Sequence, residues 1–238
     1  MAFHYTDLTD ELDVHQTSEA ATHVLPGRIS LKKTATKGLY RTVFKRVLDI
    51  TLVLLSLPLV LPLILVLAVL VSRDGGPALY TQKRVGKDGR IFTFWKLRSM
   101  VPDADAKLET YLAENPQARQ EWNVDQKLKN DPRITRFGRL LRKSSMDELP
   151  QLWNVLIGDM SLVGPRPMMP EQRPLYKGRD YFSLLPGITG FWQISDRNEC
   201  SFSERAGFDT RYNHALSFKT DLVVLMRTLR VVARGTGH

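Results

Sequence analysis

One long apolar run stands out in a chain whose other segments mix polar and apolar positions. Residues 50–71 form 22 positions interrupted only by Thr51, Ser56 and two prolines. As a straight α-helix this run would measure ~33 Å at 1.5 Å per residue, which is enough to cross a bilayer. The run leaves no polar face for solvent, so the pattern disfavours a buried helix of a soluble core.

Two prolines and the flanking charges change the prediction from a straight span to a bend. Pro58 and Pro62 lie near the middle of the run, and basic residues lie on both sides of it. An internal proline removes a helical hydrogen bond and favours a kink, and basic flanks prefer the cytoplasmic side. We therefore expect residues 41–73 to form a re-entrant helix hairpin with Pro62 or Pro58 at its apex. A single span is the alternative.

The remaining pattern predicts short strands followed by helices. Residues 78–85 and 91–97 are rich in aromatic and β-branched side chains and flank a glycine-containing turn, which is typical of a β-hairpin. Residues 103–129 and 136–142 have helical character, and residues 217–234 form an amphipathic pattern that suits either the membrane interface or packing on the domain. The expected fold class is an α-rich α+β monotopic membrane protein, with residues 74–238 forming a cytoplasmic domain that contains a small β-hairpin.

Charge is distributed unevenly along the chain. The formal net charge is +9, yet residues 1–27 contain five acidic residues and no Lys or Arg. The rest therefore carries 34 basic and 20 acidic residues, a net charge of +14. We expect residues 1–40 to be an acidic flexible tail, and the basic remainder to bind anionic partners such as phosphorylated molecules, nucleic acid or an acidic membrane. The single Cys200 excludes an intrachain disulfide and favours a reducing compartment.

Candidate chemistry centres on two adjacent carboxylates, Asp147 and Glu148. The sequence Ser145-Met146-Asp147-Glu148 fits a capping box, in which both acids merely begin a helix. The functional interpretation uses the same geometry, because a helix N-terminus would keep Asp147 ionised. An ionised and rigidly held carboxylate can attack phosphorus or hold a divalent cation.

Basic residues surround the acidic pair in the sequence. Arg142 precedes it in a basic helical segment, Lys96 lies in the second predicted strand, and Arg166 stands between two prolines that fix its backbone. A guanidinium donates two hydrogen bonds to phosphate oxygens at once. Together these residues predict a site for a phosphorylated, metal-bound substrate. Two simpler interpretations remain. Lys96 could be an ordinary charge that keeps a strand edge soluble, and Arg142 could lie on a solvated helix face.

Several ordered motifs identify a family. Residues 44–232, about four fifths of the chain, resemble the bacterial sugar transferases, or small monotopic phosphoglycosyl transferases, which begin exopolysaccharide and glycan assembly. The matching blocks are Lys45-Arg46 with Asp49, Phe94-Trp95-Lys96-Leu97-Arg98-Ser99-Met100, Asp131-Pro132-Arg133-Ile134-Thr135, Asp147-Glu148-Leu149-Pro150-Gln151, Gly158-Asp159-Met160-Ser161, Val163-Gly164-Pro165-Arg166-Pro167 and Pro186-Gly187-Ile188-Thr189-Gly190.

This resemblance implies a reaction and roles for the site residues. A hexose 1-phosphate would pass from a UDP-sugar to undecaprenyl phosphate with release of UMP, and galactose or glucose would be the sugar. Asp147 would be the nucleophile that forms a phosphoryl-aspartate and would bind Mg²⁺, and Glu148 would handle a proton or position the acceptor. Lys96, Arg142 and Arg166 would bind substrate phosphates.

The resemblance also implies a location at the inner membrane of a bacterium, with the catalytic domain facing the cytoplasm and membrane lipids as partners. It favours Pro62 over Pro58 as the apex. It predicts no nucleic acid partner, and self-association into a homo-oligomer stays open. Two other classes compete: a non-catalytic membrane-attached basic module that binds nucleic acid or anionic lipid, and a scaffold of a polysaccharide assembly complex. Neither explains the acidic pair.

Overall fold

The computed structural model describes residues 38–125, 128–195, 202 and 204–233, all within the unit Leu31–His238. The predicted tail at residues 1–40 lies almost entirely outside the described residues. The elements follow in the order α1 (Lys45–Val71), β1 (Leu79–Val85), β2 (Ile91–Leu97), α2 (Ala104–Glu114), α3 (Pro116–Asp125), α4 (Arg136–Lys143), α5 (Gln151–Ile157), β3 (Ser161–Val163), β4 (Gly187–Thr189), α6 (Arg205–Ala215) and α7 (Phe218–Ala233).

The predicted β-hairpin is confirmed. β1 and β2 pair antiparallel with Tyr80 opposite Lys96 and Val85 opposite Ile91. A second sheet, which the sequence did not predict, consists of the short parallel strands β3 and β4. The helices expected at residues 103–129, 136–142 and 217–234 are present as α2 with α3, α4 and α7. The helix-rich architecture with small sheets confirms the α-rich α+β class.

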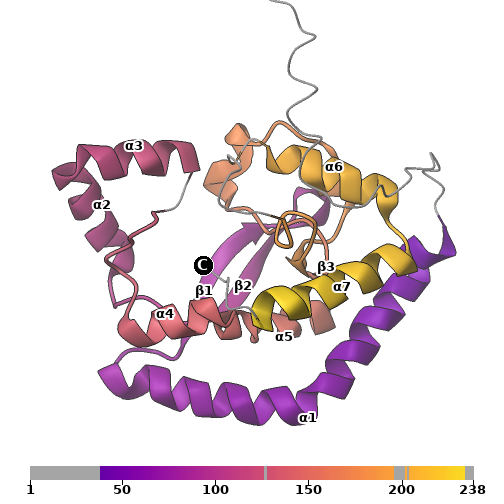
Figure 1. Cartoon of the computed structure of the whole chain (residues 1–238), viewed down its shortest axis with the longest axis horizontal. Helices are drawn as coiled ribbons and strands as arrows, with labels where there is room; N and C mark the ends of the chain where they lie inside the picture. The colour runs from indigo at the N-terminus through magenta and orange to yellow at the C-terminus, as the bar shows by residue number, and fades with distance from the viewer. Residues whose placement is uncertain (1–37, 126–127, 196–201, 203, 234–238) are drawn as a thin grey trace, which may run out of the picture. The chain divides into compact units, whose positions relative to one another are not determined.

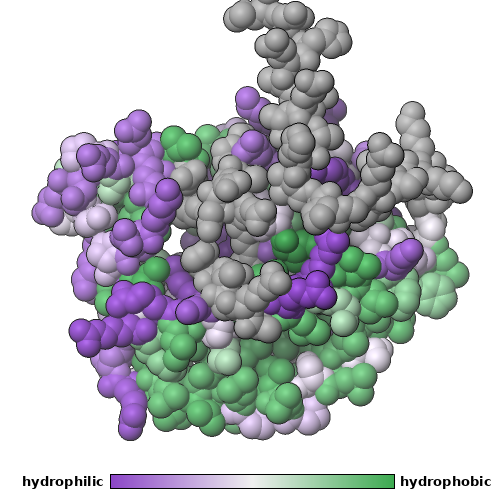
Figure 2. Space-filling model, in the orientation of Figure 1, coloured by the Kyte–Doolittle hydropathy of each residue, from purple (hydrophilic) through white to green (hydrophobic). Residues whose placement is uncertain are grey.

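Helix α1 is continuous through both prolines, and Figure 1 shows it as two arms that meet at a bend. It is long and apolar enough to cross a membrane, judged by length and composition. Pro58 and Pro62 are exposed, and no residue between Val53 and Leu67 is buried. Hydrophobic residues cover the α1 region in Figure 2. A membrane-inserted hairpin remains a prediction.

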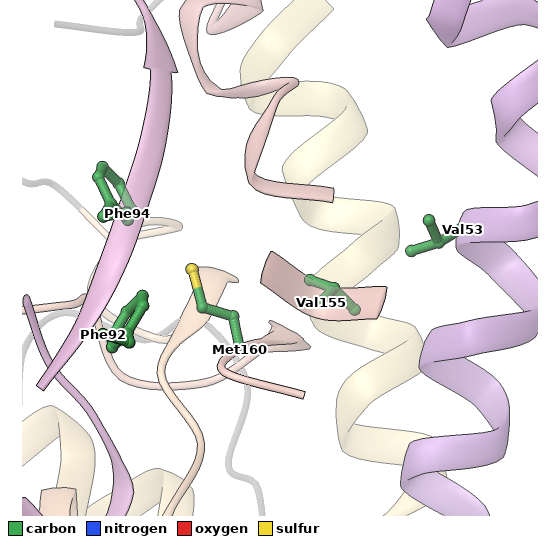
Figure 3. Close-up of a cluster of buried hydrophobic side chains, with 5 residues drawn as sticks. All are labelled: Val53, Phe92, Phe94, Val155 and Met160. Carbon is green, nitrogen blue, oxygen red and sulfur yellow. The ribbon is translucent and has the colours of Figure 1, made fainter. Parts of the chain in front are cut away.

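The N-terminal arm of α1 packs on the domain through apolar and polar contacts. Val53 joins a buried cluster with Phe92, Phe94, Val155 and Met160, which brings together α1, β2 and α5 (Figure 3). The Asp49 Oδ1 atom accepts a hydrogen bond from the Leu162 backbone N–H over 3.1 Å. At the first residue of α1, the Lys45 Nζ atom lies 2.7 Å from Asp221 Oδ2 in α7.

The C-terminal arm of α1 is held on the same domain. Leu67 and Val71 belong to a buried cluster with Leu97 and Leu141. The Arg98 guanidinium donates to the Val71 carbonyl over 3.2 Å and also pairs with Asp74. These contacts place the end of β2 beside the C-terminal end of α1. Both ends of α1 are therefore attached to one folded unit.

Candidate active site

The acidic pair occupies a short 3₁₀ turn, Met146–Glu148, between α4 and α5. The predicted capping box is wrong: Ser145 has φ 56° and makes no side-chain capping bond, and α5 begins only at Gln151. A left-handed residue directly before the turn changes the chain direction, so the acids do not begin an α-helix. Asp147 is 4% exposed, which makes it one of the buried charged residues of the chain.

Lys96 lies against both carboxylates. Its Nζ atom is 2.7 Å from Glu148 Oε1 and 3.3 Å from Asp147 Oδ2. β2 is positioned for this contact by Asn154 of α5, whose side chain donates to the Thr93 carbonyl and accepts from the Trp95 backbone N–H. One ammonium group thus compensates two adjacent negative charges in a site from which water is largely excluded.

Arg166 approaches the acidic pair from the loop that follows β3. It follows β3 in the loop Val163-Gly164-Pro165-Arg166-Pro167, and its Nη1 atom lies 3.7 Å from Glu148 Oε1. The loop is fixed on β4, because Gly164 N–H donates to the Thr189 carbonyl and Gly187 N–H donates to the Pro165 carbonyl. The motif at residues 163–167 and the motif at residues 186–190 therefore form one structural unit.

Arg142 borders the site without pairing directly with the acids in the described structure. It ends α4, and its Nε atom donates to Ser99 Oγ over 2.8 Å. Burial, opposed by the charge of Asp147, lowers the pKa of the Arg142 guanidinium. The structure thus brings together Asp147, Glu148, Lys96 and Arg166, with Arg142 beside them, whereas Pro58 and Pro62 lie in the exposed part of α1.

Two further arginines near the site were not predicted from the sequence. Arg84 in β1 donates to the carbonyl of Pro167, the residue after Arg166. Arg205, the first residue of α6, stacks on Trp192, over which Arg166 also lies. Neither residue belongs to a motif that the sequence analysis recognised. The sequence pattern places Arg84 on a strand, but it does not show which part of the protein that strand packs against.

The donor set suits a cation that is shared with phosphate. Within the described ranges no group of three or more His, Cys, Asp or Glu side chains could hold a metal ion. Mg²⁺ in phosphate-binding sites commonly uses only one or two carboxylates together with substrate phosphates and water. Asp147 and Glu148 provide such a pair, so these residues fit the ion only in the presence of a phosphorylated substrate.

A family model described as "Bacterial sugar transferase" matches residues 40–235. The chain belongs to the bacterial sugar transferase family. The resemblance seen in the motifs is therefore confirmed, and the acidic pair, Lys96 and Arg166 all lie inside the matched region.

Named relatives of this bacterial sugar transferase come from several bacteria. An undecaprenyl-phosphate galactose phosphotransferase of Salmonella typhimurium is 47% identical over 195 residues, which are 81% of this chain and 41% of the relative. A UDP-galactose-lipid carrier transferase of Erwinia amylovora is 48% identical, with the same shares covered. The exopolysaccharide production protein ExoY of Rhizobium meliloti is 42% identical over 81% of this chain and 87% of its own length. The chain spans about two fifths of the first two relatives.

Proposed function

We propose that this bacterial sugar transferase moves a hexose 1-phosphate from a UDP-sugar to undecaprenyl phosphate, releases UMP, and so begins the synthesis of an exopolysaccharide. One observation carries the proposal: a buried Asp147 and its neighbour Glu148 share Lys96, and Glu148 also lies near Arg166, in a domain that holds both ends of an apolar helix. The names of the relatives support the substrates and the pathway, and galactose is favoured over glucose because two of those names contain it.

Transfer takes place in two displacements in this proposal. A carboxylate oxygen of Asp147 attacks the sugar-side phosphorus, the bond from that phosphorus to the bridging oxygen breaks, and UMP leaves with the electron pair. An oxygen of undecaprenyl phosphate then attacks the phosphoryl-aspartate, and the carboxylate leaves unchanged. Glu148 positions the acceptor phosphate and takes its remaining proton. Lys96, Arg142 and Arg166 stabilise the charge on the transferred group.

Mg²⁺ is part of the proposal. Asp147 would hold the ion together with the diphosphate, with Glu148 close by. When bound, the ion supplies neutralisation of charge on the phosphate oxygens. Lys96 keeps the two carboxylates in place, because its single ammonium contacts both of them.

The membrane arrangement is argued from the two attached ends of α1. Val53 and Leu67 are buried in the domain and lie 14 residues apart, ~21 Å along a helix. A bent segment of that length, held at both ends on one unit, reaches into a single leaflet and does not cross ~30 Å of hydrocarbon. This supports a re-entrant hairpin with the domain on the cytoplasmic face, where UDP-sugars are available.

The direct test is UMP release from UDP-galactose or UDP-glucose by the purified full chain with Mg²⁺ and undecaprenyl phosphate. We expect release by the wild type, essentially none by Asp147→Asn, and wild-type release by Glu171→Gln, which changes an exposed acid outside the site. Unchanged release by Asp147→Asn would remove the assigned nucleophile. Absence of release by the wild type with both sugars would contradict the proposed function.

A further inference from the structure

Arg166 also lines a small pocket. Its walls include the aromatic rings of Tyr176, Trp192 and Phe202 and the charged side chains of Arg166, Arg205 and Asp209. Arg166 therefore belongs to two places at once: its Nη1 atom is 3.7 Å from Glu148 Oε1, and its guanidinium lies over Trp192 at 5.6 Å from the ring centroid.

Arg205 is held in this pocket by aromatic rings in place of acids. Its guanidinium carbon lies 4.3 Å from the Trp192 ring centroid and 4.7 Å from that of Phe202. Its Nε atom is buried and has no hydrogen-bond partner, and among the described residues it forms no ion pair with a carboxylate. Cation–π contacts offset only part of the cost of burying such a charge.

Arg84, in strand β1, also has a buried Nε atom without a hydrogen-bond partner. Two of its nitrogens donate to Pro167 O and Gln82 Oε1, over 3.1 and 2.6 Å, while its Nε atom is buried without a partner. It also takes part in no ion pair within the described part of the chain. Its bond to Pro167 places it directly behind the loop that carries Arg166.

Burial and the positive charge of Arg166 both lower the pKa values of Arg84 and Arg205. Burial, and after it the charge of Arg166, lowers the pKa of Arg205 to about 9 and that of Arg84 to about 10. Asp209 compensates little, because burial raises its pKa to about 7 despite the hydrogen bond from Tyr176. Buried like charges without acidic partners destabilise a protein unless an anion binds between them. Positive charge therefore exceeds negative charge around this pocket.

We propose that Arg84, Arg166 and Arg205 form a phosphate-binding site for the nucleotide half of the donor. This inference rests on the proposed function for the identity of the donor. The diphosphate would lie along Arg166, with the sugar-side phosphorus at Asp147 and the nucleoside-side phosphate at Arg84 and Arg205. UMP, the leaving group of the first displacement, would remain bound there until it dissociates.

The test measures binding of UMP, pyrophosphate and uridine to the purified full chain in detergent by isothermal titration calorimetry. We expect UMP to bind about 10- to 100-fold more weakly to Arg205→Gln and to Arg84→Gln, as befits the loss of a charged hydrogen bond. Pyrophosphate should weaken in parallel, and uridine should bind weakly to every form.

Matched controls separate this site from a general loss of positive charge. Arg211→Gln removes an arginine of α6 that stacks on Phe208, and Lys83→Gln removes a basic residue of β1 that bonds Thr93. Both should bind UMP within about twofold of the wild type. Arg205→Lys keeps the charge but not the planar fork, so its affinity should be intermediate. Thermal unfolding checks that each variant is folded.

Kinetics distinguish this inference from the proposed function. Arg205→Gln should raise the KM for the UDP-sugar and leave the KM for undecaprenyl phosphate unchanged. UMP and pyrophosphate affinities that are the same in folded Arg205→Gln, Arg84→Gln and wild type would overturn the inference while leaving phosphosugar transfer intact. Binding of UMP that depends on both arginines, in a chain that transfers no sugar phosphate, would support the site and contradict the function.

Discussion

At the scale of single residues, the site has two adjacent acids and few basic groups close enough to compensate their charge. Asp147 and Glu148 share one lysine, and Arg166 is close only to Glu148. In the described part of the chain, Lys96 is the ion-pair partner of Asp147. A single lysine contact suits the proposed role of Asp147 as the nucleophile.

Lys96→Gln should test that balance. Without the shared ammonium the two carboxylates repel each other and lose a phosphate ligand, so we expect UMP release to fall by about 10²-fold. The measurement is the initial rate of UMP release at saturating donor, with Lys87→Gln in the exposed turn of the β-hairpin as control. A rate within a factor of two of the wild type would contradict the role of Lys96.

Asp209 gives a prediction for pH. Its folded-state pKa of about 7 exceeds its ordinary value of 3.8, so the folded protein binds this proton more tightly than the unfolded chain. The stability that the protonated group provides is present below about pH 4 and is lost as the pH rises to about 7. Relative to Asp209→Asn, the wild type should lose up to about 4 kcal/mol over this window.

The measurement for Asp209 is thermal or denaturant unfolding of both proteins between pH 4 and pH 8. The asparagine keeps an acceptor for the Tyr176 hydroxyl, which bonds Asp209 Oδ2 over 2.6 Å, so packing should be retained. A stability difference between the two proteins that stays constant across this range would show that the Asp209 carboxyl does not titrate as described.

The sequence predicted the residues of the site better than their local structure. Asp147, Glu148, Lys96 and Arg166 were found because their motifs occur together and in order. The conformation at Ser145 could not be found, since a capping-box pattern does not encode the left-handed turn that the surrounding packing imposes. Arg84 and Arg205 were missed because only the folded chain brings them to Arg166.

At the scale of elements, α7 has one side that packs on the domain and one exposed apolar side. Asp221 and Val224 on one side are buried in the domain, and Asp221 accepts hydrogen bonds from Tyr40, Lys45 and Tyr212. Another side leaves Leu222, Met226 and Leu229 exposed at helical spacing. The periodicity of the sequence predicted the helix correctly. Only the folded structure shows which side of the helix is buried.

We propose that the exposed apolar side of α7 lies in the membrane interface, which gives a prediction. Leu229→Glu, at a residue 65% exposed, should weaken association with vesicles of anionic lipid, because a carboxylate would enter an apolar and negatively charged boundary. Flotation with such vesicles measures the bound fraction. Lys219→Glu, on the same helix, controls for charge alone, and equal losses in the two variants would contradict an apolar contact.

At the scale of the whole chain, the proposed membrane arrangement rests on where the two ends of α1 are attached. The N-terminal arm is attached through Lys45 and Val53, and the C-terminal arm through Val71 and Arg98. Hydropathy alone could predict the apolar helix but could not distinguish a span from a hairpin. That distinction depends on contacts between segments far apart in the sequence.

Cysteine labelling tests this arrangement. In a Cys200→Ser background, Thr42→Cys and Ser72→Cys place one thiol near each end of α1. We expect neither thiol to react with a membrane-impermeant reagent added to intact cells, and both to react after the cells are opened. Labelling of one end from outside would replace the hairpin with a single span.

The attachment of α1 has a consequence for any attempt to obtain the enzyme without this apolar helix. Val53, Leu67 and Val71 complete the same apolar clusters to which Phe92, Phe94 and Leu97 belong. Removal of α1 would expose both apolar clusters to solvent. Strand β2, which carries Lys96, would then lose the residues that it packs against. Helix α1 is thus part of the hydrophobic core that supports the candidate site, and we expect a truncated chain without it to lose its fold.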